Sequence, residues 1–104
     1  MSLQQKQKIT NLLTICIKAG KIVKGYDSVV EAMKGSTVSC VMTAADISPK
    51  TLKETAFMCS KYNTVLIQTE LTKEEIGQFA GKQTAVIAVC DKGFADKFMT
   101  LSNT

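Results

Sequence analysis

The sequence has 104 residues, of which 45% are hydrophobic and 21% charged, a composition typical of a globular domain and not of a disordered chain. Lysines number 13 and acidic residues 9, which gives a formal net charge of +4, and arginine and histidine are absent. The missing histidine excludes Ser-His and Cys-His catalysis and histidine-ligated metal sites, and the missing arginine excludes bidentate contacts to phosphate or guanine.

The first predicted element is an amphipathic helix. Its apolar residues recur at intervals of three and four positions, through Ile9, Leu12, Leu13, Cys16 and Ile17. Gly20 follows where a glycine commonly ends a helix. A short strand from Lys21 to Lys24 is expected next, and it leads to Gly25.

A second helix is predicted to begin at Ser28 and to run through Met33, because Ser28 and Glu31 have the spacing of a capping box. Three further strands are predicted where apolar residues run almost without interruption, in "SCVMTA", "NTVLIQ" and "TAVIAVC". Such runs are typical of strands that are covered on both faces.

Three more helices accompany these strands. Ser48 at the N-cap and Pro49 at the first helical position predict the third helix, and a capping box of Thr72 and Glu75 predicts the fourth. The fifth is marked by Phe94, Phe98 and Leu101. Five helices alternating with four strands predict an α/β fold, a three-layer α/β/α sandwich that forms one domain over residues 1–104.

The four cysteines, Cys16, Cys40, Cys59 and Cys90, are widely spaced and lie in apolar stretches. They are expected to be buried thiols in a reducing compartment, with no disulfide, metal site or cofactor. The amino-terminal residues include no uninterrupted apolar stretch of signal-peptide length, and no segment approaches the roughly 20 apolar residues that span a bilayer. We therefore expect a cytoplasmic protein with no membrane partner.

The triplet Ala-Gly-Lys occurs at residues 19–21 and 80–82, and it calls for a test against phosphate-binding loops. The first copy is assigned to the end of the first helix. The second fails the Walker A pattern, since Gly77 stands one residue too close to Gly81, Gln83 replaces the required serine or threonine, and the segment runs from helix into strand. Neither copy predicts a nucleotide site.

Three stretches resemble, in order, the signature regions of the ribosomal protein 7Ae family: "GKIVKGYDSVVEAMKGS", "VMTAADISPKTL" and "EIGQFAGKQTAVIAV". The resemblance covers nearly the whole chain, and its ending, "DKGFA", is most similar to a bacterial paralogue within the family. It implies a mixed four-stranded sheet with the first strand antiparallel to the last. The loop after Lys24 would then lie beside the loop before Ala85.

The resemblance also implies candidate RNA-binding residues near the second helix. Lys24 and Gly25 match the family's lysine and glycine that approach the RNA backbone. In the family motif G-x-N-E-x-x-K the asparagine and glutamate read sheared guanines, and here Asp27 and Ser28 stand at those positions, with Glu31 in place of the lysine. For Ser28 and Glu31 the alternative interpretation is helix capping.

Further candidates flank these positions. Tyr26 is placed to stack on an unpaired base, although a lone tyrosine also serves to cover a neighbouring apolar edge. The loop before the last strand presents the remaining candidate RNA-binding residues, which are Gly81, Lys82, Gln83 and Thr84.

We therefore expect a non-enzymatic, monomeric RNA-binding protein that binds structured, kink-turn-like RNA and is associated with the ribosome or translation. The alternative is a protein-interaction module of the same fold, in which Asp27 and Glu31 have removed the affinity for kink-turns. A positive surface around Gly25 would favour RNA, and a neutral surface with an apolar patch would favour a protein partner.

Overall fold

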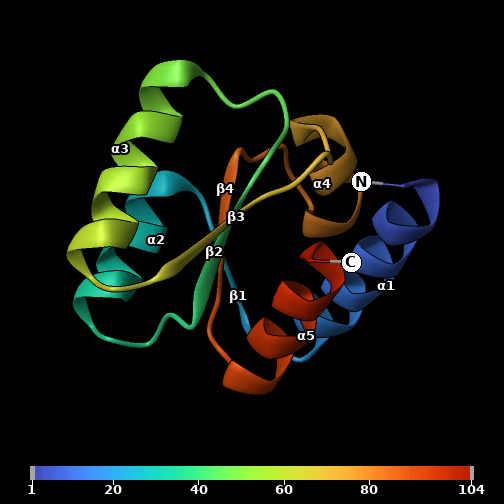
Figure 1. Ribbon diagram of the computed structural model, residues 1–104, viewed down its shortest axis with the longest axis horizontal. Coiled ribbons are helices and arrows are strands. Elements are labelled where there is room, and N and C mark those ends of the chain that lie inside the picture. The colour runs from blue at the N-terminus through green and yellow to red at the C-terminus, as the bar shows by residue number, and fades with distance from the viewer. Residues whose placement is uncertain (1, 104) are drawn as a thin grey trace.

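Helices and strands alternate along residues 2–103, the part of the chain that the computed structural model describes (Figure 1). The nine elements of this range are α1 (Leu3–Lys18), β1 (Ile22–Lys24), α2 (Tyr26–Lys34), β2 (Cys40–Thr43), α3 (Pro49–Lys61), β3 (Val65–Gln68), α4 (Lys73–Ala80), β4 (Val86–Val89) and α5 (Lys92–Ser102). Among these helices none has the length and apolar character needed to cross a membrane.

The four strands form one mixed sheet in the order β1-β4-β2-β3. β4 runs antiparallel to both of its neighbours, with Lys24 of β1 opposite Ile87, while β3 is parallel to β2. The predicted mixed sheet, with its first strand antiparallel to its last, is therefore confirmed.

Alternate residues of the strands pack into two separate cores, because successive side chains of a strand point to opposite faces of a sheet. Met42 and Ile87 pack with α1, α4 and α5 around Phe98, which is fully buried. Val41 and Ala88 pack on the other face with α2 and α3. Two helical layers thus enclose the sheet, which confirms the three-layer sandwich (Figure 1).

β3 departs from the expectation that every strand after the first is covered on both faces. Val65 is 45% exposed, and Ile67 alone among the four residues of β3 is buried. β3 lies at the outer edge of the sheet, where it has a neighbour on one side only. The apolar run correctly predicted a strand, but it did not reveal this position.

Helix termini follow their sequence signals in α1, α3 and α4. Gly20 adopts a φ of +72°, and its amide donates to Ile17 O while that of Lys21 donates to Cys16 O, the paired bonds of a Schellman motif. The predicted cap of α3 by Ser48 and the capping box of α4 are both present. These predictions are confirmed.

The start of α2 differs from the prediction. The helix begins at Tyr26 with Gly25 as its N-cap, and Gly25 O accepts from Val29 N at 2.9 Å. Ser28 therefore lies inside the first turn, and the predicted capping box of Ser28 and Glu31 is wrong. The physical reason is that Gly25 has a φ of +90°, which lets the chain turn directly from β1 into the helix.

Candidate functional site

The candidate residues gather at one edge of the sheet, where β1, β2 and β3 end and β4 begins, at the top of Figure 1. Gly25 N donates to Val86 O at 2.9 Å, so the turn after β1 lies directly beside the loop that precedes β4. Gly20 lies at the opposite end of β1. The resemblance implied this arrangement, and the pairing of β1 with β4 produces it.

Lys24 is bound to the protein itself. Its half-buried side chain donates from Nζ to Ala80 O at 2.6 Å, and Ala80 is the last residue of α4. An ammonium group at this point satisfies a carbonyl that has no partner within the helix and complements the negative end of the helix dipole. Lys24 thereby fixes the end of α4, from which the loop of residues 81–84 departs.

Gly77 holds the same loop from the other side. A Cβ atom at Gly77 would lie 2.9 Å from Gln83 N and 3.1 Å from Lys82 C, both backbone atoms, so only glycine lets the loop fold back this closely on α4. The sequence comparison with Walker A did not reveal this role. The signal that could have revealed it is the glycine within a helical pattern, which usually has a packing reason.

The loop itself divides into exposed and buried residues. Gly81 ends α4 with a φ of +91°, and Lys82 and Gln83 are exposed. Thr84 is only 7% exposed, and its hydroxyl donates to Val86 O at 3.0 Å. The loop therefore presents a cation and an amide to solvent, while the side chain of Thr84 stabilises it from within.

Tyr26, Asp27 and Ser28 form the first turn of α2. Asp27 and Ser28 are exposed, and the carboxylate of Asp27 lies near the positive end of the helix dipole. Tyr26 is half-buried against α3, beside a hollow of about 260 Å³ that is also lined by Glu54 and Phe57. Burial raises the pKa of the Tyr26 hydroxyl, and the carboxylates of Glu54 and Asp27 add to this. Its packing agrees with the interpretation that it covers an apolar edge.

Two acidic residues near the site have structural partners. Glu31 lies 3.9 Å from Lys34 Nζ, one turn further along α2, and both side chains are largely exposed. Asp46, in the loop after β2, accepts from Lys73 N at 2.8 Å and so joins this loop to the start of α4. Neither of these two interactions involves the turn formed by Lys24 and Gly25.

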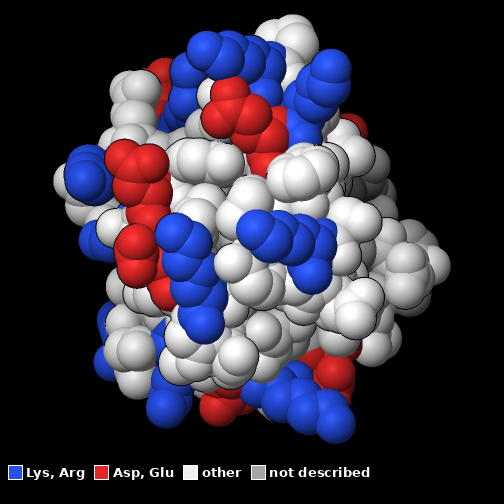
Figure 2. All heavy atoms as spheres, turned by 90° about the vertical axis from the view of Figure 1, so that its left-hand side faces the viewer, with Lys and Arg blue, Asp and Glu red and all other residues white. Residues whose placement is uncertain are grey.

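The charge around the site is balanced. Outside α1 and α5 the sequence has eight lysines and eight acids, so this part of the chain has no formal net charge. Figure 2 shows the result on the face covered by α2 and α3, where acidic side chains lie directly beside the lysines. Within the described range the candidate site therefore presents individual lysines and no broad basic surface.

The four cysteines are free thiols. Burial raises the pKa of Cys16 to about 11, that of Cys40 to about 12 and that of Cys59 to about 11. Cys90 is half-buried, and its pKa is raised as well. These thiols are protonated at neutral pH and pack as small apolar groups.

The profile of the ribosomal protein L7Ae/L30e/S12e/Gadd45 family matches residues 7–99 of this sequence, which include both candidate loops. The chain belongs to this family. Within the L7Ae family it is similar to the RNA-binding protein YlxQ of Bacillus subtilis (strain 168), with 31% identity over 91 residues that cover 86% of this chain and 90% of that protein. The RNA-binding protein YlxQ of Enterococcus faecium is 29% identical over 92 residues, covering 88% of each chain.

A solved structure has the same fold. A protein of unknown function from Bacillus halodurans C superimposes with a TM-score of 0.85 and 26% identity, over 91% of this chain and 96% of that one. The prediction of an L7Ae-family protein close to a bacterial paralogue is confirmed, and the paralogue is YlxQ.

Proposed function

We propose that this chain binds structured RNA, without catalysing a reaction, through the edge formed by residues 24–28 and 81–84. The antiparallel pairing of β1 with β4 carries this proposal, because it sets Gly25 against Val86 and joins the two candidate segments into one surface. Two similar bacterial proteins are named as RNA-binding proteins, which supports the choice of ligand.

The residues of this edge have different roles in the proposed complex. Lys82 supplies a point charge for phosphate, and Lys24 holds the loop in place through Ala80. Gly25 and Gly81 have positive φ angles, and a Cβ atom at either would meet nothing within 4 Å, so the RNA backbone can approach the main chain on that side.

Base recognition falls to the side chains around this backbone contact. Asp27, Ser28 and Gln83 are exposed and offer acceptors and donors to base edges. Tyr26 contributes its exposed part to stacking, and Thr84 acts by stabilising the loop.

The proposed partner is a kink-turn-like RNA of the ribosome or translation apparatus, bound in the cytoplasm by a monomer that acts as one domain. A titration of the purified chain against a standard kink-turn duplex, and against a duplex lacking the sheared G·A pairs, tests this at several salt concentrations. Selective binding that weakens with salt is the expected result. Equal affinity for both duplexes would reject kink-turn recognition, and no affinity for either would reject RNA binding at this edge.

The alternative, a protein-interaction module without kink-turn affinity, is favoured by the exposed Phe57 beside the hollow at Tyr26 and by the balanced charge near Gly25. Asp27 and Glu31 place two exposed carboxylates on α2, in the part of the chain that has no net charge. Glu31→Lys separates the two functions. It should tighten kink-turn binding about tenfold if α2 faces RNA, because two unit charges 4 Å apart interact by ~1 kcal/mol in water and the reversal counts twice before screening by salt.

The matched control is Asp96→Lys, the same change of net charge on α5, on the other side of the sheet. It should leave the affinity for the kink-turn nearly unchanged. Equal effects of the two substitutions would show that only net charge matters, and no effect of Glu31→Lys would favour the protein-interaction module.

A further inference from the structure

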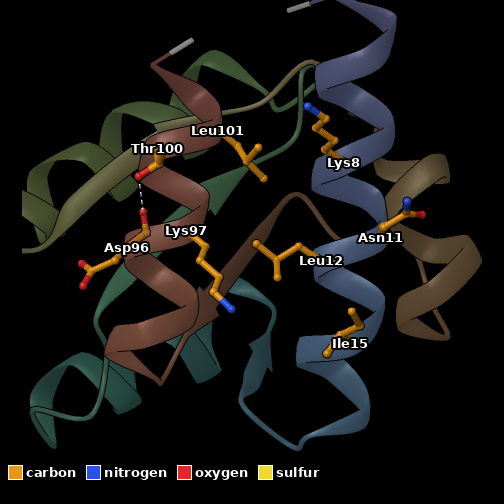
Figure 3. Close-up of a pocket in the computed structure, with 8 residues that line it drawn as sticks. All are labelled: Lys8, Asn11, Leu12, Ile15, Asp96, Lys97, Thr100 and Leu101. Carbon is orange, nitrogen blue, oxygen red and sulfur yellow. Dashed lines mark hydrogen bonds between the residues drawn. The ribbon is translucent and has the colours of Figure 1, made fainter.

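An open groove runs between α1 and α5, on the face of the sheet opposite α2 and α3. Its volume is about 540 Å³, within the range of binding pockets. Figure 3 shows the residues that line it, which are Lys8, Asn11, Leu12, Ile15, Asp96, Lys97, Thr100 and Leu101. None of them belongs to the proposed RNA-binding edge.

The floor of the groove is aliphatic. Leu12 on α1 and Leu101 on α5 are half-buried and point into the space between the two helices (Figure 3). Ile15 is 56% exposed, an unusual exposure for a large apolar side chain beside two others. From Lys8 to Ile15 the groove follows α1 for two turns, or about 10 Å.

The rim of the groove has a net positive charge, with Lys8 and Lys97 against the exposed carboxylate of Asp96. Lys8 and Lys97 are exposed, and within residues 2–103 neither makes an ion pair. α1 carries three lysines and no acid, and α5 carries two lysines and one acid, so these two helices together hold a formal charge of +4, equal to the net charge of the whole chain. An aliphatic floor therefore lies between two lysines that form no ion pair with any residue of the described range 2–103.

We propose that this groove binds an acidic amphipathic helix of another protein. The leucine-type side chains of that helix would lie over Leu12, Ile15 and Leu101, and its glutamates and aspartates would face Lys8 and Lys97. Burial of an apolar stripe in a groove between two helices is a common mode of peptide recognition, and the opposite charges select the partner.

Other occupants fit the same observations less well. A second copy of this chain would bring the same positively charged helices against this face, which like-charge repulsion opposes. RNA is recognised by stacking and by close backbone approach, yet the eight lining residues include no aromatic residue and no glycine. A membrane surface would meet a recessed floor and not a protruding apolar face.

The test uses the full chain, labelled with ¹⁵N, and a synthetic helical peptide of about 14 residues with leucines at i, i+3, i+4 and i+7 and glutamates on its flanks. The control peptide has the same composition, but its leucines alternate so that they cannot share one helical face. The helical peptide should cause saturable shifts in residues 8–15 and 96–101 and none in residues 24–28 and 81–84.

Ile15→Lys should weaken peptide binding at least about tenfold, because the loss of apolar contact outweighs the attraction between the added ammonium group and the acidic peptide. The matched control is Phe57→Lys, which changes an exposed apolar residue on α3, across the sheet, and should leave peptide binding unchanged. If Ile15→Lys lowers thermal stability, the double reversal Lys8→Glu with Lys97→Glu replaces it and should weaken binding by a similar factor at low salt.

Several results would overturn the proposal: no saturable shifts at millimolar peptide, equal shifts with the control peptide, or equal loss in the Ile15 and Phe57 variants. Self-association detected by sedimentation, with shifts at this groove, would assign it to a second copy. Tighter binding of a kink-turn duplex or of phosphatidylserine vesicles at residues 8–15 would assign it to RNA or to a membrane. The proposed RNA binding at residues 24–28 and 81–84 is tested separately, and among these outcomes only a kink-turn duplex bound at residues 8–15 would count against it.

Discussion

Replacing Gly77 by alanine tests whether this residue shapes the proposed RNA-binding loop. The added Cβ atom would lie 2.9 Å from Gln83 N and 3.1 Å from Gln83 Cα. Ordinary contact begins at 3.4 Å, so the backbone of the loop must retreat by about 0.5 Å or α4 must bend.

Two opposing effects set the magnitude. Alanine is favoured over glycine in a helix interior by about 1 kcal/mol, whereas overpacking against fixed neighbours costs about 1–3 kcal/mol. The neighbours here are backbone atoms, which cannot rotate away as a flexible side chain would. We expect the free energy of unfolding to fall by about 1 kcal/mol and the affinity for RNA to fall about tenfold, because Lys82 is displaced with the loop.

Urea unfolding measures the first effect, and titration with the kink-turn duplex measures the second. Gly35→Ala is the matched control, since a Cβ atom at Gly35 would lie 3.6 Å from Ala32 O, an ordinary contact, and its φ is −82°. That control should change neither stability nor affinity appreciably. If Gly77→Ala instead raises stability by about 1 kcal/mol with RNA affinity unchanged, the packing argument is wrong.

Three further predictions concern charge and protonation. Lys82→Ala should lower the salt slope of RNA binding by nearly one and leave the melting temperature unchanged. Lys24→Met removes the hydrogen bond to the end of α4 and, unlike Lys82→Ala, should lower the melting temperature. Glu75 accepts a hydrogen bond from Thr72 N, and this bond, with the ion pair to Lys6, lowers the pKa of the Glu75 carboxyl. The ionised carboxylate adds less than about 1 kcal/mol to the free energy of unfolding, because its side chain is partly exposed. This contribution is present above the pKa of Glu75 in the unfolded chain and is lost as the pH falls through the lower pKa in the folded chain. Urea unfolding of the chain and of Glu75→Ala between pH 7 and pH 3 should therefore show a difference that shrinks in acid. At pH 8 iodoacetamide should modify at most one thiol of the native chain, Cys90, and all four in guanidinium, as counted by mass spectrometry, and rapid modification of a second native thiol would contradict the burial described.

Local signals predicted most of the elements, because they act between residues close in the sequence. The apolar spacing of α1, the Schellman glycine Gly20 and the cap at Ser48 each depend on a few neighbouring residues. The spacing of Ser28 and Glu31 predicts the wrong start for α2, because Gly25 already provides the turn into the helix. Two valid local signals competed there, and the backbone freedom of glycine decided between them.

Features that depend on strand order could not be derived from local signals. The exposure of Val65 follows from the position of β3 at the sheet edge, and the meeting of Gly25 with Val86 follows from the pairing of β1 with β4. The family resemblance implied that pairing, but it did not imply that Lys24 is bound to Ala80. Such a bond joins residues 56 positions apart and depends on the packing of α4.

The uneven distribution of charge described above makes the molecule an electric dipole whose axis crosses the sheet. One pole is the pair α1 and α5, with all of the net charge, and the other is the formally neutral remainder that includes residues 24–28 and 81–84. At low salt, where the Debye length is long, a polyanion is drawn toward the α1 and α5 pole, so long-range attraction does not steer it to the proposed RNA-binding edge. Productive encounters at that edge then require rotational diffusion, which favours association rates well below those of electrostatically steered complexes.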